Sequence, residues 1–146
     1  MSGYETYLDA VIDALEDAVE ACSSFNSSSV HFDYFRTEDY GNYDPICLLS
    51  LQRDSIAAIG AKETEHILTF QVWVKHTGTG TKENLSEIIS YVGEIIDYIE
   101  AHRKLGISTY IEKTEVTNVE YSMSAPPSGV IYSAVLTVEV QIIRNV

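Results

Sequence analysis

The segment from Val130 to Ile143 alternates between two kinds of side chain, and this regularity restricts the fold more than any other pattern in the chain. One face is wholly apolar and carries Val130, Tyr132, Ala134, Leu136, Val138, Val140 and Ile142. The opposite face is mixed and carries Ile131, Ser133, Val135, Thr137, Glu139, Gln141 and Ile143. A period of two is typical of a strand with one face in the core. We therefore expect a sheet that is covered on one side.

A second alternating segment, from Glu65 to His76, leads into a long amphipathic helix from about Thr81 to Leu105. Thr79 or Thr81 suits the helix start, and Gly106 lies just past the expected end. The helix has one wide apolar stripe, formed by Leu85, Ile88, Ile89, Val92, Ile95, Ile96 and Ile99. Its last turn is expected to hold three basic residues, His102, Arg103 and Lys104. A helix of this length can cross a whole sheet.

Residues Tyr4 to Cys22 predict a first helix, and its two faces differ in character. The apolar face holds Leu8, Val11, Ile12, Leu15, Ala18, Val19 and Cys22. The other face is acidic and holds Glu5, Asp9, Asp13, Glu16, Asp17 and Glu20. A solvated surface is the plain interpretation of such a charge run. The alternative is a face directed at a basic partner, or at a passage that must repel DNA.

The remaining segments complete a predicted α+β fold in a single domain of residues 1–146, with a mainly antiparallel sheet and two helices packed on it. Val30 to Phe35 and Ile46 to Gln52 are expected to be short strands, and Arg36 to Pro45 an exposed loop. Arg53 to Lys62 predicts a hairpin arm. Thr109 to Ser122 is rich in β-forming residues but alternates poorly.

Composition excludes several classes of function. The net charge of -13 argues against electrostatic attraction to nucleic acid, but it would suit a passage through which DNA slides. Cys22 and Cys47 are too few for a disulfide framework and are expected to be reduced core thiols. No apolar run approaches the roughly 18 residues that a membrane span needs, and no signal peptide is evident.

No motif for catalysis, metal or cofactor binding stands out. Gly78 to Lys82 lies between a strand and a helix, but its spacing does not match a phosphate-binding loop. His66 and His76 share a strand face, yet lie too far apart to hold one ion. A calcium site around Asp33, Glu38, Asp39 and Asp44 lacks the regular ligand spacing. We therefore expect no enzyme, no metal and no cofactor.

The order of elements resembles the tail-terminator and neck proteins (tail-completion and head–tail joining proteins) of tailed bacteriophages and archaeal tailed viruses. The likeness rests on the strand Leu68 to Val74, the helix Asn84 to Lys104 and the closing strand Tyr132 to Val140, and it extends from Tyr4 to Ile143. The resemblance implies a virion structural protein at the head–tail junction, assembled in the host cytoplasm. Its subunits would form a ring, usually hexameric, without cofactor or catalytic residues.

The resemblance also implies the partners. The ring would cap the tail tube protein, contact neck or connector proteins, and let DNA pass through its lumen without specific binding. We expect the ring contacts to use strand edges and the apolar residues of the outer sheet face, namely Ile67, Trp73, Val135 and Ile143. The tip from Arg53 to Glu63 is expected to face the lumen. A different class of function, a small adaptor or ligand-binding module acting as a monomer or dimer, fits the same fold.

Overall fold

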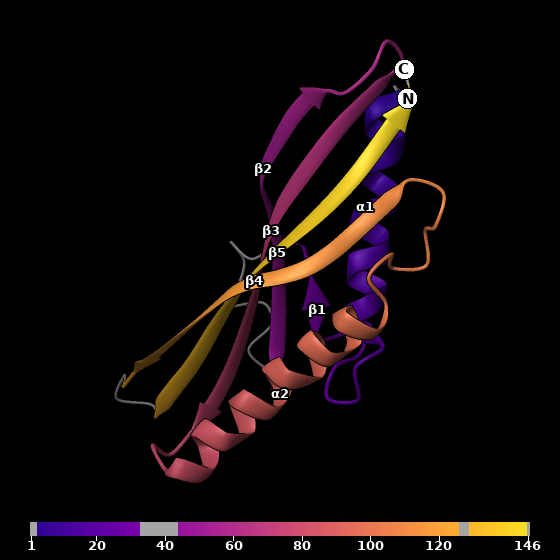
Figure 1. Ribbon diagram of the computed structural model, residues 1–146. Coiled ribbons are helices and arrows are strands. Elements are labelled where there is room, and N and C mark those ends of the chain that lie inside the picture. Colours follow the sequence, from indigo (N-terminus) through magenta and orange to yellow (C-terminus); the bar gives the residue numbers. More distant parts are fainter. Residues whose placement is uncertain (1–2, 33–43, 126–128, 146) are drawn as a thin grey trace.

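The computed structural model describes residues 3–32, 44–125 and 129–145, in which two helices lie on the same side of one sheet (Figure 1). In chain order the elements are α1 (Gly3–Glu20), β1 (Val30–His31), β2 (Ile46–Ala58), β3 (Glu63–Gly78), α2 (Lys82–Ala101), β4 (Ile111–Ser124) and β5 (Val130–Asn145). This arrangement is the predicted single α+β domain.

The strand order is β1-β2-β3-β5-β4, and every pairing except the parallel β1–β2 contact is antiparallel. β3 pairs with β5 along its whole length, from Glu63 opposite Asn145 to Gly78 opposite Val130. β2–β3 and β4–β5 are hairpin neighbours, and α2 connects β3 to β4 across the sheet face. The sheet is therefore long and narrow, because its two central strands each have 16 residues.

The core lies between the inner sheet face and the two helices. The predicted apolar face of β5 is buried from Tyr132 to Ile142, which confirms the alternation as a core pattern. α1 buries its stripe through Leu8, Val11, Leu15, Ala18 and Val19. α2 buries Ile88, Val92, Ile95 and Ile99. Two other members of the α2 stripe, Leu85 and Ile89, are exposed by 42% and 49%, so the stripe is wider than the surface it covers.

The start of α2 follows the sequence prediction. Thr81 is the N-cap: its hydroxyl accepts from the Asn84 backbone N–H, and the Asn84 side chain accepts from the Thr81 backbone N–H. This reciprocal capping satisfies backbone N–H groups that the first turn leaves without helical partners. Gly78 is required beside the cap, because a Cβ there would lie 2.5 Å from Asn84 Cγ.

The end of α2 differs from the prediction, because the helix stops at Ala101 and not near Leu105. His102 leaves helical geometry with φ -132° and ψ 58°, and Leu105 and Gly106 take positive φ values of 47° and 79°. His102, Arg103 and Lys104 therefore follow the helix and do not fill its last turn. The apolar stripe of the helix ends at Ile99, and the next large apolar residue, Leu105, packs half-buried against the core from the turn that follows the helix.

The ends of α1 and β2 also differ from the prediction. α1 ends at Glu20, two residues before the predicted end at Cys22. β2 continues six residues beyond Gln52, to Ala58, and forms the hairpin predicted for the Arg53 to Lys62 arm. A register shift lies between Leu51 and Arg53, which interrupts the alternation and hides the second half of this strand in the sequence.

Irregular pairing also explains the poor alternation of β4. Its register with β5 shifts between Ile111 and Lys113, and again between Val116 and Asn118. Each bulge moves the following side chains to the other face.

Residues 33–43 lie outside the described part of the chain. They include most of the predicted Arg36 to Pro45 loop and the end of the predicted Val30 to Phe35 strand. Asp33, Glu38 and Asp39 lie there too.

Both cysteines are buried free thiols, as predicted. Burial, with a smaller contribution from the Glu94 carboxylate, raises the pKa of Cys22 to about 11. Burial also raises the pKa of Cys47. Thiols in such surroundings stay protonated and are poor nucleophiles.

In the described residues, no helix has the length and apolar character that crossing a bilayer demands.

Candidate interaction surfaces

The four predicted contact residues all lie half-buried on the outer sheet face, which faces away from the helices. Trp73 and Val135 are directly opposite each other in the β3–β5 ladder. Ile67 and Ile143 are diagonal neighbours, because Ile143 is opposite Glu65. Six residue steps along β3, from Ile67 to Trp73, separate these two apolar pairs by about 20 Å.

Trp73 takes part in cross-strand packing. Its ring lies under the Lys75 ammonium, with Nζ 4.8 Å from the ring centroid. Trp73 and Val135 form one side of a shallow hollow of about 230 Å³, which Leu48, Ser50 and Gln71 complete. A tryptophan beside a hollow is the kind of residue that anchors protein contacts.

Both edges of the sheet carry unpaired strand backbone within the described residues. β1 pairs only with Cys47 and Leu48, so the rest of β2 has no strand on its outer side there. β4 forms the opposite edge and pairs only with β5. Open edges present rows of N–H and C=O groups that another chain can pair with.

The acidic face of α1 lies at the surface, as predicted. Glu5, Asp9, Asp13 and Asp17 are exposed, and Glu16 and Glu20 are half-buried. Burial raises the pKa of Glu16, and the neighbouring carboxylates of Glu20, Asp13 and Asp17 raise it further. The last turn of α1 contains no basic residue to offset these charges. The helix therefore presents concentrated negative charge on one face.

The two strand histidines occupy separate sites at opposite ends of β3. His66 is fully buried, and its Nδ1 lies 2.8 Å from Asp54 Oδ2. Arg144 Nε donates to His66 Nε2 at 3.2 Å, and the Tyr4 hydroxyl donates to Asp54 at 2.9 Å. Because arginine can only donate, Nδ1 of His66 carries the hydrogen that faces Asp54. This network fastens the start of α1 to the β2–β3 hairpin and to the end of β5.

His76 lies between two carboxylates. Its Nδ1 is 2.7 Å from Asp44 Oδ1, and its Nε2 is 2.9 Å from Glu87 Oε2. The His76 Nε2 and Glu87 Oε2 atoms are close enough for an ion pair, but their geometry does not meet that of a hydrogen bond. Tyr91 packs edge-on against the imidazole ring. Within the described residues, no group of three or more potential ligands is arranged to hold a metal ion.

The Gly78 to Lys82 loop serves the helix cap. Asn84 Oδ1 accepts from the Thr79 N–H at 2.9 Å and from the Thr81 hydroxyl at 3.0 Å. Tyr132 donates its hydroxyl to the Thr81 carbonyl at 3.3 Å. The side chain of Asn84 thus occupies the position where an anion would contact these backbone groups.

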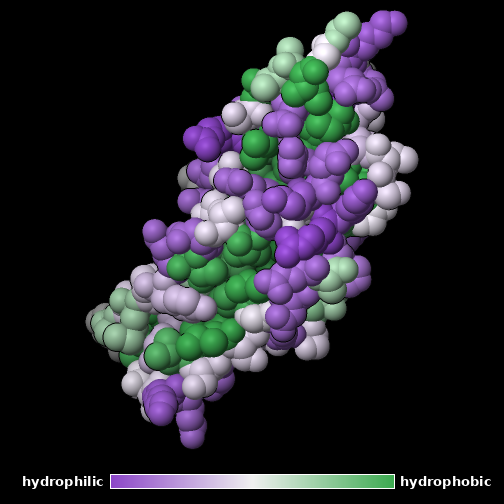
Figure 2. Space-filling model, in the orientation of Figure 1, coloured by the Kyte–Doolittle hydropathy of each residue, from purple (hydrophilic) through white to green (hydrophobic). Residues whose placement is uncertain are grey.

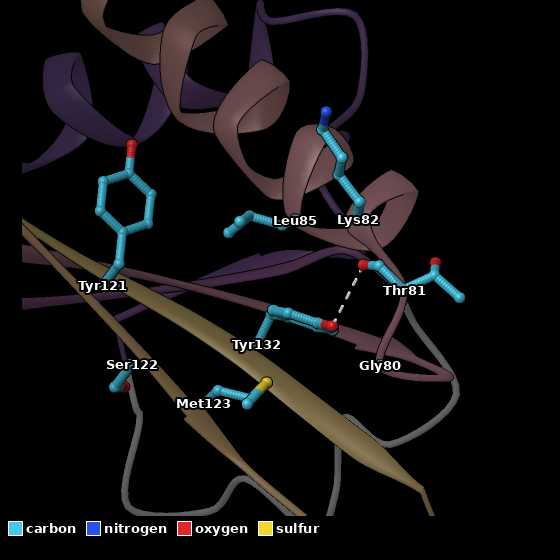
Figure 3. A pocket seen from close by; sticks show the side chains of 8 residues that line it. All are labelled: Gly80, Thr81, Lys82, Leu85, Tyr121, Ser122, Met123 and Tyr132. Atoms are coloured by element: carbon cyan, nitrogen blue, oxygen red, sulfur yellow. Dashed lines mark hydrogen bonds between the residues drawn. The ribbon is translucent and has the colours of Figure 1, made fainter.

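An apolar cleft lies beside this loop and is the feature that sequence analysis missed. Figure 3 shows Leu85 from α2 and Tyr121, Met123 and Tyr132 from the sheet around this cleft. The cleft has a volume of about 440 Å³. Leu85, Tyr121 and Met123 are exposed. Figure 2 shows a hydrophobic area on the lower half of the molecule, the half in which Figure 1 places the start of α2. The sequence evidence for this cleft was the unusual width of the apolar stripe on α2. Only the fold shows which residues of that stripe stay uncovered.

No known protein-family model matches this chain, and a search of curated proteins finds no match either.

Proposed function

We propose that this protein is a virion structural protein at the head–tail junction of a tailed virus, most closely a tail terminator. Its subunits would close into a ring, of six copies by the family resemblance, that caps the tail tube and joins it to the neck or connector proteins. The protein would be assembled in the host cytoplasm and act in the virion. The proposal assigns it no catalytic residue, metal or cofactor.

The observation that carries this proposal is that both sheet edges, on β2 and on β4, are open among the residues the structure describes. A long edge strand in a monomer is a risk, because it templates pairing with other chains. A closed ring removes that risk, since each subunit can present one edge to each neighbour. The apolar outer-face pairs Trp73–Val135 and Ile67–Ile143 would lie near such contacts and exclude water.

The charge distribution supports the same function. The chain carries a net charge of -13, and the acids of α1 are gathered on one exposed face. If that face lines the passage, the negative potential repels the phosphate backbone. DNA would then move through the ring without being held or read.

Particle mass in solution, measured together with negative-stain images of the purified chain, tests the proposal. Rings of about six subunits are expected, as the resemblance implies, either alone or after addition of purified tail-tube ends. A uniform monomer over a wide concentration range, unchanged by tail-tube ends, would refute it.

A second candidate function, a small adaptor or ligand-binding module acting as a monomer or dimer, is favoured by one observation. The cleft beside α2 has a volume of about 440 Å³, within the range of small-molecule sites. A thermal-shift screen with apolar small molecules tests this candidate. A monomer whose Tm rises with one ligand class, and whose response is lost in Met123→Glu, would support the module over the ring.

A further inference from the structure

The tip of the β2–β3 hairpin is an apolar projection. Ile59 N–H donates to the Glu63 carbonyl at 3.2 Å and closes a short loop between the strands. Ile56 and Ile59 are exposed by 59% and 49%, and two further alanines lie between them. Exposed isoleucines on a hairpin tip do not suit contact with water or DNA. They suit an apolar protein surface instead.

The cleft beside α2 is the apolar hollow of the same molecule. Its exposed lining comes from Leu85, Tyr121 and Met123, and Ile89 extends the apolar surface one helical turn further. Met123 is an adaptable side chain that can fit an incoming partner. A hollow of this size and character needs an apolar occupant.

The two surfaces cannot meet within one chain. The hairpin tip precedes the first residue of β3, Glu63, and the cleft begins two residues beyond its last residue, Gly78. A strand of 16 residues places them about 50 Å apart. Figure 1 shows the hairpin tip at the upper end and the start of α2 at the lower end. Contact between tip and cleft therefore requires two copies.

The charges beside the two surfaces are complementary. The segment from Ser55 to Lys62 contains no acidic residue, although the whole chain has a net charge of -13. The exposed pair Lys62–Glu63 ends the tip, and the exposed pair Lys82–Glu83 begins α2 at the cleft. None of these four side chains forms an ion pair with another described residue. Lys62 can face Glu83 of the next copy while Glu63 faces Lys82.

We infer that the β2–β3 hairpin tip of one copy, through Ile56 and Ile59, docks into the cleft between α2 and β4 of the next copy. The inference rests on the proposed ring function and names the contact that would build the ring. The contact joins different surfaces of the two copies, so each copy donates one tip and receives one. A closed series of such contacts leaves no tip exposed. The tip then faces a neighbouring subunit and not the lumen.

Directed cross-linking of mixed copies tests the contact. One copy carries Ile59→Cys and the other Met123→Cys, and both native cysteines are buried. After mixing, assembly and mild oxidation, a disulfide-linked dimer is expected. Ile59→Cys mixed with Glu100→Cys is the matched control, because Glu100 is exposed on α2 at the end away from the cleft. That control should give no link.

The outcomes separate this inference from the proposed function. Rings that form without the Ile59–Met123 link would refute the docking and leave the ring intact. Linked open chains without rings would support the docking and refute the closed ring. A chain that stays monomeric, with or without tail-tube ends, would refute both, and a small molecule bound in the cleft of that monomer would identify the other occupant.

A charge exchange gives a second measurement that does not alter the core. Lys62→Glu should raise the concentration needed for assembly by about tenfold, since it places two acids together at the contact. Glu83→Lys in the same chain should restore assembly. If both variants assemble like the parent, the inferred pairing of tip and cleft is wrong.

Discussion

At the scale of single residues, the buried His66 shows how one polar side chain can join three distant parts of the chain. Its two ring nitrogens contact Asp54 of β2 and Arg144 of β5, and Asp54 in turn receives the Tyr4 hydroxyl of α1. A buried polar group with both partners present is stable, but it becomes costly once a partner is lost. The network therefore stabilises one arrangement of helix, hairpin and C-terminal strand.

His66→Ala should lower the free energy of unfolding by about 2–4 kcal/mol, because it leaves a cavity and removes the partner of Asp54. Urea denaturation measures this change. His102→Ala is the matched control: His102 is exposed and its ring makes one hydrogen bond, to the Tyr98 carbonyl, so its removal should cost no more than about 1 kcal/mol. Equal effects of the two substitutions would mean that the network adds little.

Glu94 is a second residue whose environment has a measurable consequence. Burial alone would raise the pKa of Glu94, but hydrogen bonds from Ser23 and Ser24 outweigh burial and lower it. The Ser24 backbone N–H donates to Glu94 Oε1 at 3.1 Å, and both serine hydroxyls donate as well. These bonds tie the segment after α1 to the middle of α2.

Ser24→Ala should lower the free energy of unfolding at pH 7 by about 1 kcal/mol, the usual contribution of such a bond. A carboxyl with a lowered folded-state pKa contributes stability above its unfolded pKa and loses it as the pH falls through the folded value. The difference between variant and parent should therefore shrink in acid, as urea titrations at several pH values would show. Ser27→Ala, at an exposed position, should match the parent throughout.

At the scale of elements, α1 has an apolar face that folds the protein and an acidic face that the core does not use. The acids cost stability, because like charges one turn apart repel by about 0.2–0.5 kcal/mol per pair. The raised pKa of Glu16 is the local sign of that repulsion, added to burial. A costly charge cluster that packing does not need is consistent with a role outside the subunit.

Asp13→Lys combined with Asp17→Lys should leave the fold intact and alter assembly or DNA retention. Both side chains are exposed, and the change removes repulsion along the helix. Circular dichroism checks the fold, and particle mass with a DNA-binding assay checks the function. Unchanged assembly and unchanged DNA retention would show that the acidic face is only solvated surface.

At the scale of the whole molecule, the proposed assembly would have to overcome the charge of its subunits. Each copy carries -13, so neighbouring copies repel one another except where opposite charges are close. Apolar contacts at the hairpin tip and the cleft are little affected by salt, whereas long-range repulsion is screened. The inferred contact places a segment without acidic residues, Ser55 to Lys62, against the next copy.

Raising the salt concentration from about 0.05 M to 0.5 M should therefore promote assembly, since the Debye length falls below the distance between separate charge clusters. Sedimentation velocity at constant protein concentration measures the shift. Assembly that weakens steadily with salt would show that ion pairs, and not apolar docking, hold the copies together.

Elements with strictly periodic patterns could be predicted from the sequence alone. β5, most of β3, the first helix and the start of α2 are where the alternation, the stripes and the capping threonine place them. Local pattern is sufficient there, because each residue's side of the element follows from helix or strand geometry alone. The acidic face of α1 and the buried cysteines follow from the same geometry.

Features that depend on neighbouring strands and helices appear only in the folded protein. The bulge after Leu51 and the register shifts in β4 arise from pairing with partner strands. The sequence alone therefore does not reveal where β2 and β4 end. The end of α2 at Ala101 depends on how the following turn, with Leu105 at positive φ, packs against the core. The cleft at Leu85, the separation of hairpin tip and cleft, and the partners of His66 and His76 exist only once distant segments lie side by side. Contacts between segments that are distant in the sequence are properties of the assembled fold, and no local pattern encodes them.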